Sequence, residues 1–259
     1  MIKENHYNII NLDNTDSTNE YAKRLARENF LYGNVDKTVV IAESQSAGKG
    51  RLGRSFLSEN GKGIFMSILL TPGPDMSPEQ ASGLTLVAAV ALHEAILNVC
   101  GLETGIKWPN DIVADGKKLC GVLTEMSVDG SGVKFVVVGI GLNVSNEMFD
   151  KELSKLATSL YLLTGKIYDK ECLIDSILNS FDAYYEKYLK EGNLSGIREL
   201  YNDKLIHMGK LVNAINEKNI LQGVCKGINE KGHLLVEKDG MIEEVISGEI
   251  SVRGVYGYV

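Results

Sequence analysis

A glycine-rich segment between two strand-like runs constrains the fold of this chain more than any other feature. The segment reads QSAGKGRLGR and occupies residues 45–54. Its glycines match the dinucleotide-binding pattern G-x-G-x-x-G, and with Ser55 they also approach a P-loop in which arginine replaces the lysine. Both motifs place a helix directly after the glycines. Here SFLSENGKG follows, which contains two more glycines and leads into another strand-like run. The sequence therefore excludes both motifs.

The runs on either side of this segment predict strands. TVVIAE (38–43) is rich in β-branched residues, and GIFMSILL (63–70) is mostly apolar. Residues 77–99 then predict the clearest helix of the chain, in which Ser77 and Gln80 form a capping box. The glycine segment is therefore expected to be a loop between two strands.

A second group of strands follows this helix. GIKWPNDIVA (105–114) and KLCGVLTEMSV (118–128) predict strands joined at Asp115-Gly116, a dipeptide typical of hairpin turns. VKFVVVGIGLNV (133–144) is apolar throughout its middle, which predicts a strand buried on both faces.

Helices are predicted before and after these strands. DSTNEYAKRLAREN (16–29) has an apolar face and begins with a capping box made by Ser17 and Glu20. Residues 170–192 carry apolar side chains at helical spacing, and a further helix is predicted over 194–206.

The texture of the sequence changes from Met208 onward. Short strand-like runs are separated there by turn signals at 229–232 and 238–240. This pattern predicts a small antiparallel barrel. We therefore expect two domains, residues 1–207 and residues 208–259.

Charge and composition exclude several classes of function. The net charge is −7 and the sequence pI is about 5.3, which argues against a nucleic-acid-binding face. No apolar run is expected to span a membrane, and the N-terminus lacks a signal-peptide core. The four cysteines form no C-x-x-C pair, and no metal-ligand spacing is present. We therefore expect a cytoplasmic protein with reduced thiols, with neither nucleic-acid nor membrane partners and no metal site of its own.

On this acidic chain the cations of the glycine segment form a local positive cluster. Lys49, Arg51 and Arg54 alternate with glycines, which let a backbone approach a ligand closely. Such a segment can wrap an anion and offer it backbone N–H groups and guanidinium groups together. The alternative is a solvated hairpin whose charges face water. The segment alone does not decide between the two.

KWPND (107–111) is the second unusual stretch. Its proline favours an extended residue before it, so a sharp bend is expected at Asn110 and Asp111. In a functional site, Lys107 and Asn110 would lie near a phosphate and Asp111 near a metal ion or an amine. An ordinary strand-to-turn junction explains the same residues.

Single polar residues elsewhere have both a structural and a functional interpretation. A lysine at a strand start is typically a solvated edge residue, and a serine–threonine pair typically caps a helix. A helix N-terminus can also receive a polar ligand group. A polar side chain buried in an apolar strand needs a hydrogen-bond partner. The residues concerned are Lys118, Ser17, Thr18, Gln45 and Asn143.

In their order along the chain, these stretches resemble the biotin–protein ligases, enzymes that attach biotin to a carrier lysine. The matching pieces are DSTN (16–19), AESQSAGKGRLGRSF (42–56), KWPND (107–111), KKLCGVLTE (117–125), GIGLNV (139–144) and GEISVR (248–253). The resemblance implies an α+β fold with a mixed β-sheet and helices of the class II tRNA synthetase type, plus a small C-terminal SH3-like barrel. It points to the monofunctional type without an N-terminal DNA-binding domain, because only 16 residues precede Ser17.

The resemblance also implies roles by motif position. Contacts to biotin would come from Ser17, Thr18, Asn19, Gln45, Gly48, Lys49, Gly50, Arg51, Lys118 and Gly121. Catalytic cations at the carboxyl–phosphate junction would be Lys49, Arg51 and Lys118. Contacts to ATP or its Mg²⁺ would come from Arg54, Lys107, Asn110 and Asn143.

Two positions depart from the family's loop pattern, G-R-G-R-x-G-R-x-W. Lys49 replaces an arginine, which keeps the charge but loses the bidentate geometry. Phe56 replaces the tryptophan, which keeps the aromatic packing but loses an N–H donor.

The implied reaction is a ligation in two steps. The biotin carboxylate attacks the α-phosphate of ATP to give biotinyl-AMP and pyrophosphate. The amine of a lysine of a biotin carboxyl carrier domain then attacks the carbonyl carbon of this mixed anhydride, which forms the amide and releases AMP. The first step brings two anions together, so fixed cations and Mg²⁺ are needed to neutralise them. The carrier would belong to a biotin-dependent carboxylase, and the family allows a homodimer.

Three alternatives are weighed against this interpretation. Lipoate ligases share the sheet and the adenylate chemistry, but their arginine–glycine motif is not visible here and KWPND favours biotin. A biotin-dependent repressor needs a helix-turn-helix of about 60 residues before the ligase part. A nucleotide-binding module without activity is disfavoured because Arg51 and Lys118 are retained.

Overall fold

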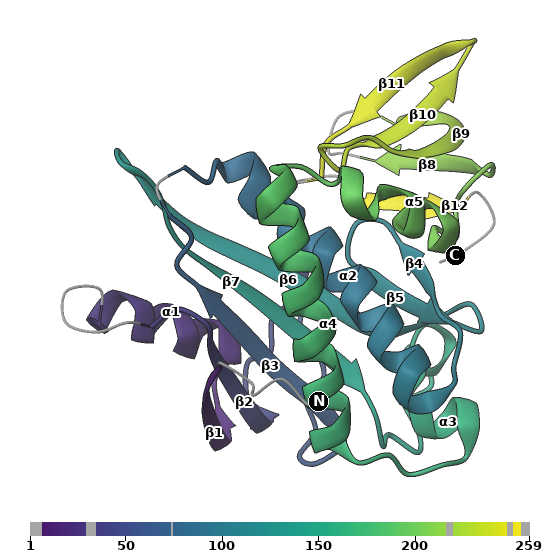
Figure 1. The fold of residues 1–259 in the computed structure, drawn as a ribbon. Coiled ribbons are helices and arrows are strands. Elements are labelled where there is room, and N and C mark those ends of the chain that lie inside the picture. The colour runs from purple at the N-terminus through teal and green to yellow at the C-terminus, as the bar shows by residue number, and fades with distance from the viewer. Residues whose placement is uncertain (1–6, 30–34, 74, 216–219, 248–250, 255–259) are drawn as a thin grey trace.

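The described residues form two β-sheets, together with helices that pack on the larger one (Figure 1). The computed structural model describes residues 7–29, 35–73, 75–215, 220–247 and 251–254.

The first sheet has seven strands. In chain order they are β1 (Asn8–Thr15), β2 (Thr38–Gln45), β3 (Gly63–Leu70), β4 (Gly105–Lys107), β5 (Asp111–Ala114), β6 (Lys117–Asp129) and β7 (Gly132–Asn143). Their order in the sheet is β1-β2-β3-β7-β6-β5-β4. The pair β1 and β2 is parallel, and the other neighbouring pairs are antiparallel. The predicted mixed sheet is therefore confirmed.

Helices cover both faces of this sheet. They are α1 (Thr18–Asn29), α2 (Pro78–Cys100), α3 (Leu160–Thr164), α4 (Lys170–Glu191) and α5 (Ser195–Lys204). Side chains of β7 alternate between two apolar cores, as its sequence predicted: Val136 and Val138 belong to the core under α2 and α4. Phe135 and Val137 belong to a smaller core with Ala22 of α1. The opposite face of the sheet from α2 and α4 is thus the face on which α1 lies.

Helix α2 is the core helix of the larger unit. Ser77 caps it, and the Ser77–Gln80 capping box is present as predicted. By length and hydropathy α2 could cross a membrane, so the expectation that no run reaches such a span is wrong. However, 67% of that apolar window is buried within the protein. The hydropathy of α2 is therefore accounted for by its packing between the sheet and α4.

The second sheet is small and antiparallel throughout. Its strands are β8 (Leu211–Ile215), β9 (Ile220–Ile228), β10 (Leu234–Lys238), β11 (Met241–Val245) and β12 (Ser251–Gly254), in the order β11-β10-β9-β8-β12. The predicted C-terminal antiparallel unit is confirmed. The expected boundary at residue 207 lies between α5 and β8. Within the motif GEISVR, residues 248–250 lie outside the described residues.

Three local differences from the sequence prediction have physical reasons. The predicted strand 105–114 is two strands, β4 and β5, because a turn at Trp108–Asn110 interrupts it and the peptide bond before Pro109 is cis. Strand β1 was not predicted, since most of its side chains are exposed and carry no apolar pattern. Helix α3 has only five residues, too few to show helical periodicity.

The predicted capping box of α1 is also wrong. The backbone N–H of Ser17 donates to Asp16 Oδ1 at 2.7 Å, so it does not bind Glu20. The carboxylate of Glu20 instead pairs with Lys23 and Lys49. The first-turn glutamate of α1 is therefore available for contacts across the site.

A buried histidine at the junction of the two sheets makes the fold sensitive to acid. The ring of His207 is 1% exposed, and among the described residues neither ring nitrogen has a hydrogen-bond partner. Burial, with added repulsion from Lys107 and Lys210, lowers the pKa of His207 to about 4 from its ordinary 6.5. A depressed histidine pKa leaves stability intact above pH 6.5 and removes it as the pH falls toward 4.

We therefore expect His207→Leu to flatten the pH dependence of stability. Between pH 7.5 and pH 4 the wild type should lose about 3 kcal/mol of unfolding free energy through this one group. Urea unfolding of both proteins at several pH values measures the loss, with pH 8 as the reference at which His207 is neutral in either state. An equal acid sensitivity of the variant and the wild type would contradict the prediction.

Candidate active site

The glycine segment forms a narrow hairpin between β2 and β3. Its two sides are joined by hydrogen bonds from the Phe56 N–H to the Gly48 carbonyl at 2.9 Å and from the Gly50 N–H to the Arg54 carbonyl at 2.7 Å. The turn is a single 3-10 turn in which Leu52 and Gly53 have positive φ. The helix that a Rossmann or P-loop site requires is absent from this described segment. The sequence-based exclusion of those motifs is confirmed.

Gly48 is needed by the hairpin itself. A β-carbon at this position would lie 2.6 Å from the Phe56 carbonyl oxygen and 2.7 Å from Ser58 Oγ. In this structure the close approach of Gly48 is to its own loop, and its contact with biotin stays a prediction.

An inner cavity lies between this hairpin, the start of α1 and the ends of β6 and β7. Predicted site residues that line it are Ser17, Thr18, Asn19, Gln45, Lys49, Gly50, Arg51, Asn110, Lys118 and Gly121. Residues that complete its wall are Phe56, Val122, Leu123, Gly139, Ile140 and Gly141. Segments separated by more than 120 positions in the sequence thus meet around one small space, as the motif order implied.

One end of the inner cavity is a network of neutral polar groups. The backbone N–H and the hydroxyl of Thr18 both donate to Gln45 Oε1, at 2.8 and 3.1 Å. Gln45 Nε2 donates to Ser58 Oγ at 2.8 Å. Asn19 Oδ1 accepts from Ser67 Oγ at 2.6 Å. These groups are held in fixed orientations, which suits recognition of a ligand with its own donors and acceptors.

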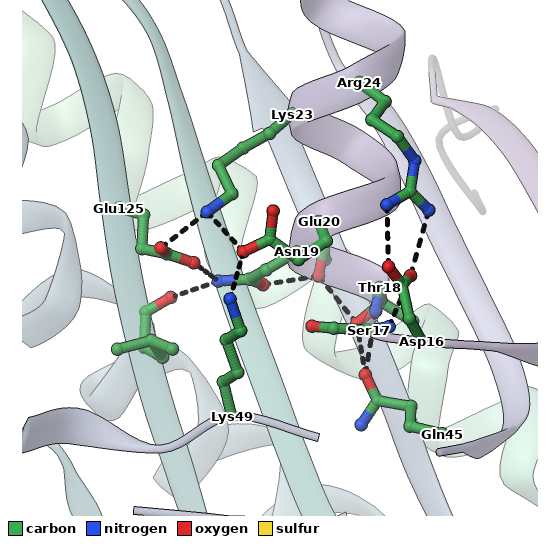
Figure 2. A network of polar contacts seen from close by, with 12 residues as sticks. Asp16, Ser17, Thr18, Asn19, Glu20, Lys23, Arg24, Gln45, Lys49 and Glu125 are labelled. Atoms are coloured by element: carbon green, nitrogen blue, oxygen red, sulfur yellow. Dashed lines mark hydrogen bonds and ion pairs between the residues drawn. The ribbon is translucent and has the colours of Figure 1, made fainter. Parts of the chain in front are cut away.

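Next to this end lies a chain of four charged side chains (Figure 2). Lys23 Nζ contacts Glu20 Oε1 at 2.8 Å and Glu125 Oε1 at 2.7 Å. Lys49 of the hairpin pairs with the same Glu20. Asn19 Nδ2 donates to Glu125 Oε2 at 2.8 Å. The charges come from α1, β6 and the hairpin, so they join the three walls of the cavity.

The opposite end of the cavity carries the other cations. Arg51 Nη1 donates to Asn110 Oδ1 at 3.2 Å, and Asn110 Nδ2 donates to the Val122 carbonyl at 2.9 Å. Burial lowers the pKa of the Arg51 guanidinium from its ordinary value, although arginine stays protonated in proteins. A cation held away from water acts on a nearby anion more strongly than a solvated one.

Lys118 is positioned at the same end. Its Nζ pairs with Asp111 Oδ1 at 2.6 Å and lies 5.9 Å from the centre of the Phe56 ring. A β-carbon at Gly121 would lie 2.8 Å from this nitrogen, so the glycine provides the space that the ammonium group occupies. Phe56 thus remains an aromatic wall, as the sequence predicted for this departure from the family pattern.

A larger outer cavity of about 560 Å³ adjoins the inner one. The glycine hairpin, including Arg54, lines one side of it, and Ser82 and Thr85 of α2 line another. The middle of β6, from Val122 to Glu125, and Ser247 of the C-terminal unit lie on its other sides. Both sheets therefore contribute to the space in front of the inner cavity.

Three predicted residues line neither cavity: Gly48, which lies within the hairpin as described above, Asn143 and Lys107. Asn143 is buried and donates from Nδ2 to the Thr158 carbonyl at 2.9 Å, which supplies the partner that its burial requires. Lys107 is 7% exposed and lies in β4. Their contact with ATP stays a prediction.

Several cavity residues were missed by the sequence analysis. Gly139 and Gly141 form its floor on β7: a β-carbon on Gly139 would lie 2.1 Å from Asn19 Oδ1, and one on Gly141 would lie 2.7 Å from the Phe56 ring. Glycines at alternate positions of an otherwise apolar strand are a signal of close approach, and could have revealed them. The acidic partners Glu20 and Glu125 gave no comparable signal, because they belong to separate segments.

The KWPND turn is held by the C-terminal unit and by α5. Trp108 Nε1 donates to the Gly232 carbonyl at 3.0 Å, and Tyr201 donates its hydroxyl to the Pro109 carbonyl at 3.3 Å. These contacts fix the turn that carries Asn110. Among the described residues, no cluster of three or more His, Cys, Asp or Glu side chains could hold a metal ion.

Comparison with known proteins shows which families and relatives this chain is similar to. Residues 12–143 match the model of the biotin/lipoate A/B protein ligase family, and residues 207–253 match that of the biotin protein ligase C-terminal domain. The bifunctional ligase/repressor BirA of Bacillus subtilis is 36% identical over 246 residues, covering 94% of this chain and 74% of that protein. The biotin–[acetyl-CoA-carboxylase] ligase of Paracoccus denitrificans is 30% identical over 248 residues, covering 94% of this chain and all of that protein.

A solved structure has the same fold over nearly the whole chain. The biotin protein ligase from Aquifex aeolicus, in complex with biotin and ATP, superposes with a TM-score of 0.82 at 32% identity. The match covers 95% of this chain and 99% of that one. Together with the two matched regions, it shows that the chain belongs to the biotin/lipoate A/B protein ligase family.

Proposed function

We propose that the chain is an ATP-dependent biotin–protein ligase. It would activate biotin as biotinyl-AMP and transfer it to a lysine of the carrier domain of a biotin-dependent carboxylase. The observation that carries this proposal is the inner cavity, which has neutral polar groups at one end and Arg51 with Lys118 at the other. A ligand with a polar uncharged head and a carboxylate tail fits such an arrangement.

The polar end would bind the ureido ring of biotin. Ser17, Thr18, Asn19 and Gln45 offer donors and acceptors there whose orientations the protein already fixes. A buried polar pair discriminates strongly against ligands that leave it unpaired. This end therefore favours biotin over lipoate, whose dithiolane ring offers no amide groups.

The cationic end would bring the carboxylate and the α-phosphate together. Two anions approach each other in this step, and the barrier falls if fixed positive groups neutralise them. Arg51 lies partly buried against Asn110, and Lys118 is available once its pairing with Asp111 is exchanged for the substrate. Lys49, predicted as a third cation of this junction, pairs with Glu20 beside the polar end, so its charge would act from a distance. The reaction needs no nucleophilic side chain.

ATP would extend from this junction into the outer cavity. Arg54 lines that cavity, and Lys107, Asn110 and Asn143 are proposed to support the nucleotide or its metal. Mg²⁺ is commonly bound by one or two carboxylates together with substrate phosphates, so the donor set here fits it without a protein cage. Asp111 would be its carboxylate ligand, and the ion would supply further neutralisation of the phosphates.

Transfer requires the carrier lysine to reach the mixed anhydride. The outer cavity is bordered by hydroxyl side chains of Ser82, Thr85 and Ser247, and it leads to the cationic end of the inner cavity. We propose that the lysine enters there. We also propose that the enzyme is cytoplasmic and has neither nucleic-acid nor membrane partners. A homodimer is compatible with this proposal.

Transfer of labelled biotin to a carrier domain tests this function directly. We expect incorporation only when ATP is present, with release of one pyrophosphate per biotin transferred. Lipoate added in excess should compete weakly, because it cannot satisfy the polar end of the cavity. Incorporation of lipoate in preference to biotin, or pyrophosphate release without biotin, would contradict the proposal.

A further inference from the structure

The four-charge chain next to the inner cavity connects the glycine hairpin to the rest of the protein. Glu20 and Lys23 lie one turn apart on α1, Glu125 lies on β6, and Lys49 is on the hairpin (Figure 2). Two ammonium groups face two carboxylates, so the chain is electrically balanced. Glu20 is its central member, because its Oε1 contacts both Lys23 and Lys49.

The Lys49–Glu20 pair differs from an ordinary surface ion pair because it connects the glycine hairpin to α1. The Lys49 side chain is half exposed, whereas those of Glu20 and Lys23 are 23% and 13% exposed. Lys23, itself paired with Glu125, fixes Glu20 from the protein side, so its carboxylate is held in place before Lys49 arrives. The pair spans the space between α1 and the hairpin beside Asn19, which lines the inner cavity.

The size of the inner cavity gives this contact a consequence. The cavity has room for about 40 Å³, far below the ~300–1,000 Å³ typical of sites for small molecules. A ligand with the volume of biotin therefore needs the hairpin to move away from the sheet and return. The Lys49–Glu20 pair breaks when the hairpin moves out and forms again when it returns.

We propose that Glu20 is a positioning residue that acts through Lys49 to hold the glycine hairpin closed over the acyl-adenylate. This inference rests on the proposed ligase function and assigns Glu20 no contact with substrate. The pair is re-formed on closure, so it slows the escape of the intermediate into water. It leaves the attack by the carrier lysine unchanged, because that lysine enters from the outer cavity.

The test compares Glu20→Gln, Lys49→Met and the double variant with the wild type. The intermediate is formed from biotin and ATP without carrier, and its release is followed by trapping with hydroxylamine. Exposed ion pairs contribute ~0.2–1 kcal/mol, so release from Glu20→Gln should be about 1.4–5-fold faster. Addition of salt should speed release from the wild type and have little effect on Glu20→Gln, since the screened charge pair is gone.

The double variant separates action through Lys49 from other effects. If Glu20 acts through Lys49, the double variant should release the intermediate no faster than Lys49→Met alone. Additive effects would overturn the inference, and so would fast release from Lys49→Met with normal release from Glu20→Gln. Arg24→Gln is the matched control, because it removes an ion pair of the same helix, to Asp16 at 2.7 Å, outside the two cavities.

A second measurement does not depend on activity. Trypsin cleaves after Lys49, Arg51 and Arg54, and an open hairpin exposes these bonds. We expect Glu20→Gln to be cleaved there faster than the wild type and the Arg24→Gln control. Equal cleavage would overturn the inference. A wild-type protein that forms no adenylate would instead refute the proposed function, an outcome that the trapping assay reports before any variant is compared.

Discussion

Arg51→Ala is expected to slow formation of biotinyl-AMP on the order of 10²-fold. The guanidinium lies at the cationic end of the inner cavity, where burial lowers its pKa and Asn110 orients it. Loss of a charge-assisted hydrogen bond in such a place costs ~1.5–3 kcal/mol, which corresponds to about one to two powers of ten in rate. Biotin-dependent exchange of labelled pyrophosphate into ATP measures this step without the carrier.

Arg51→Lys provides the matched comparison. Lysine keeps the positive charge but loses the planar, five-donor geometry that binds a carboxylate and a phosphate together. We expect it to recover part of the exchange rate and to remain below the wild type by about tenfold. Wild-type exchange in Arg51→Ala would remove this residue from the reaction, whereas full recovery in Arg51→Lys would show that charge alone suffices.

Gly139→Ala is expected to abolish measurable biotin binding and to destabilise the protein. The added β-carbon would lie 2.1 Å from Asn19 Oδ1, a distance at which the two atoms cannot remain. Asn19 would have to leave its hydrogen bonds with Ser67, Leu123 and Glu125. Each buried polar group left unpaired costs ~1–3 kcal/mol, so a loss of about 2–4 kcal/mol in unfolding free energy is expected.

A double variant distinguishes the two consequences. In Asn19→Ala/Gly139→Ala, the methyl group of residue 139 no longer meets an amide. Stability should therefore be higher than the sum of the single changes predicts. Biotin affinity should stay low, because Asn19 is itself part of the polar end. Urea unfolding and calorimetric titration with biotin measure the two quantities, and recovery of both together would show that Asn19 has only a structural role.

The parts of the fold that depend on local sequence could be predicted. The strand–loop–strand arrangement around the glycine segment followed from the missing helix. The capping box of α2 followed from Ser77 and Gln80, which are three residues apart. Strand β7 followed from its unbroken apolar middle. In each case the relevant interaction lies within one element or between neighbours in the chain.

The parts of the fold and of the site that depend on contacts between distant residues could not be predicted from the sequence. Glu20 and Lys49 are 29 positions apart and are joined only because β2 ends beside the start of α1. Gly139 is recognisable as a floor residue only once β7 is placed under Asn19, 120 positions earlier. At Glu20 the local pattern gave a wrong prediction. A capping box was expected there, but the Glu20 carboxylate forms ion pairs with Lys23 and Lys49. Motif order predicted the site residues by resemblance, and the sheet register explains why most of them line one cavity.

The hydrogen bond from the Trp108 indole to the Gly232 carbonyl links the two units of this protein. Trp108 is 2% exposed, and the acceptor of its N–H belongs to the C-terminal unit. A chain cut at residue 207 would lose the acceptor of this hydrogen bond and weaken the hold on the turn that carries Asn110. Removal of the small sheet would therefore alter the turn beside the candidate active site. Any shortened, fused or circularly rearranged version must keep both sheets covalently or physically together for the nucleotide side of the site to retain its shape.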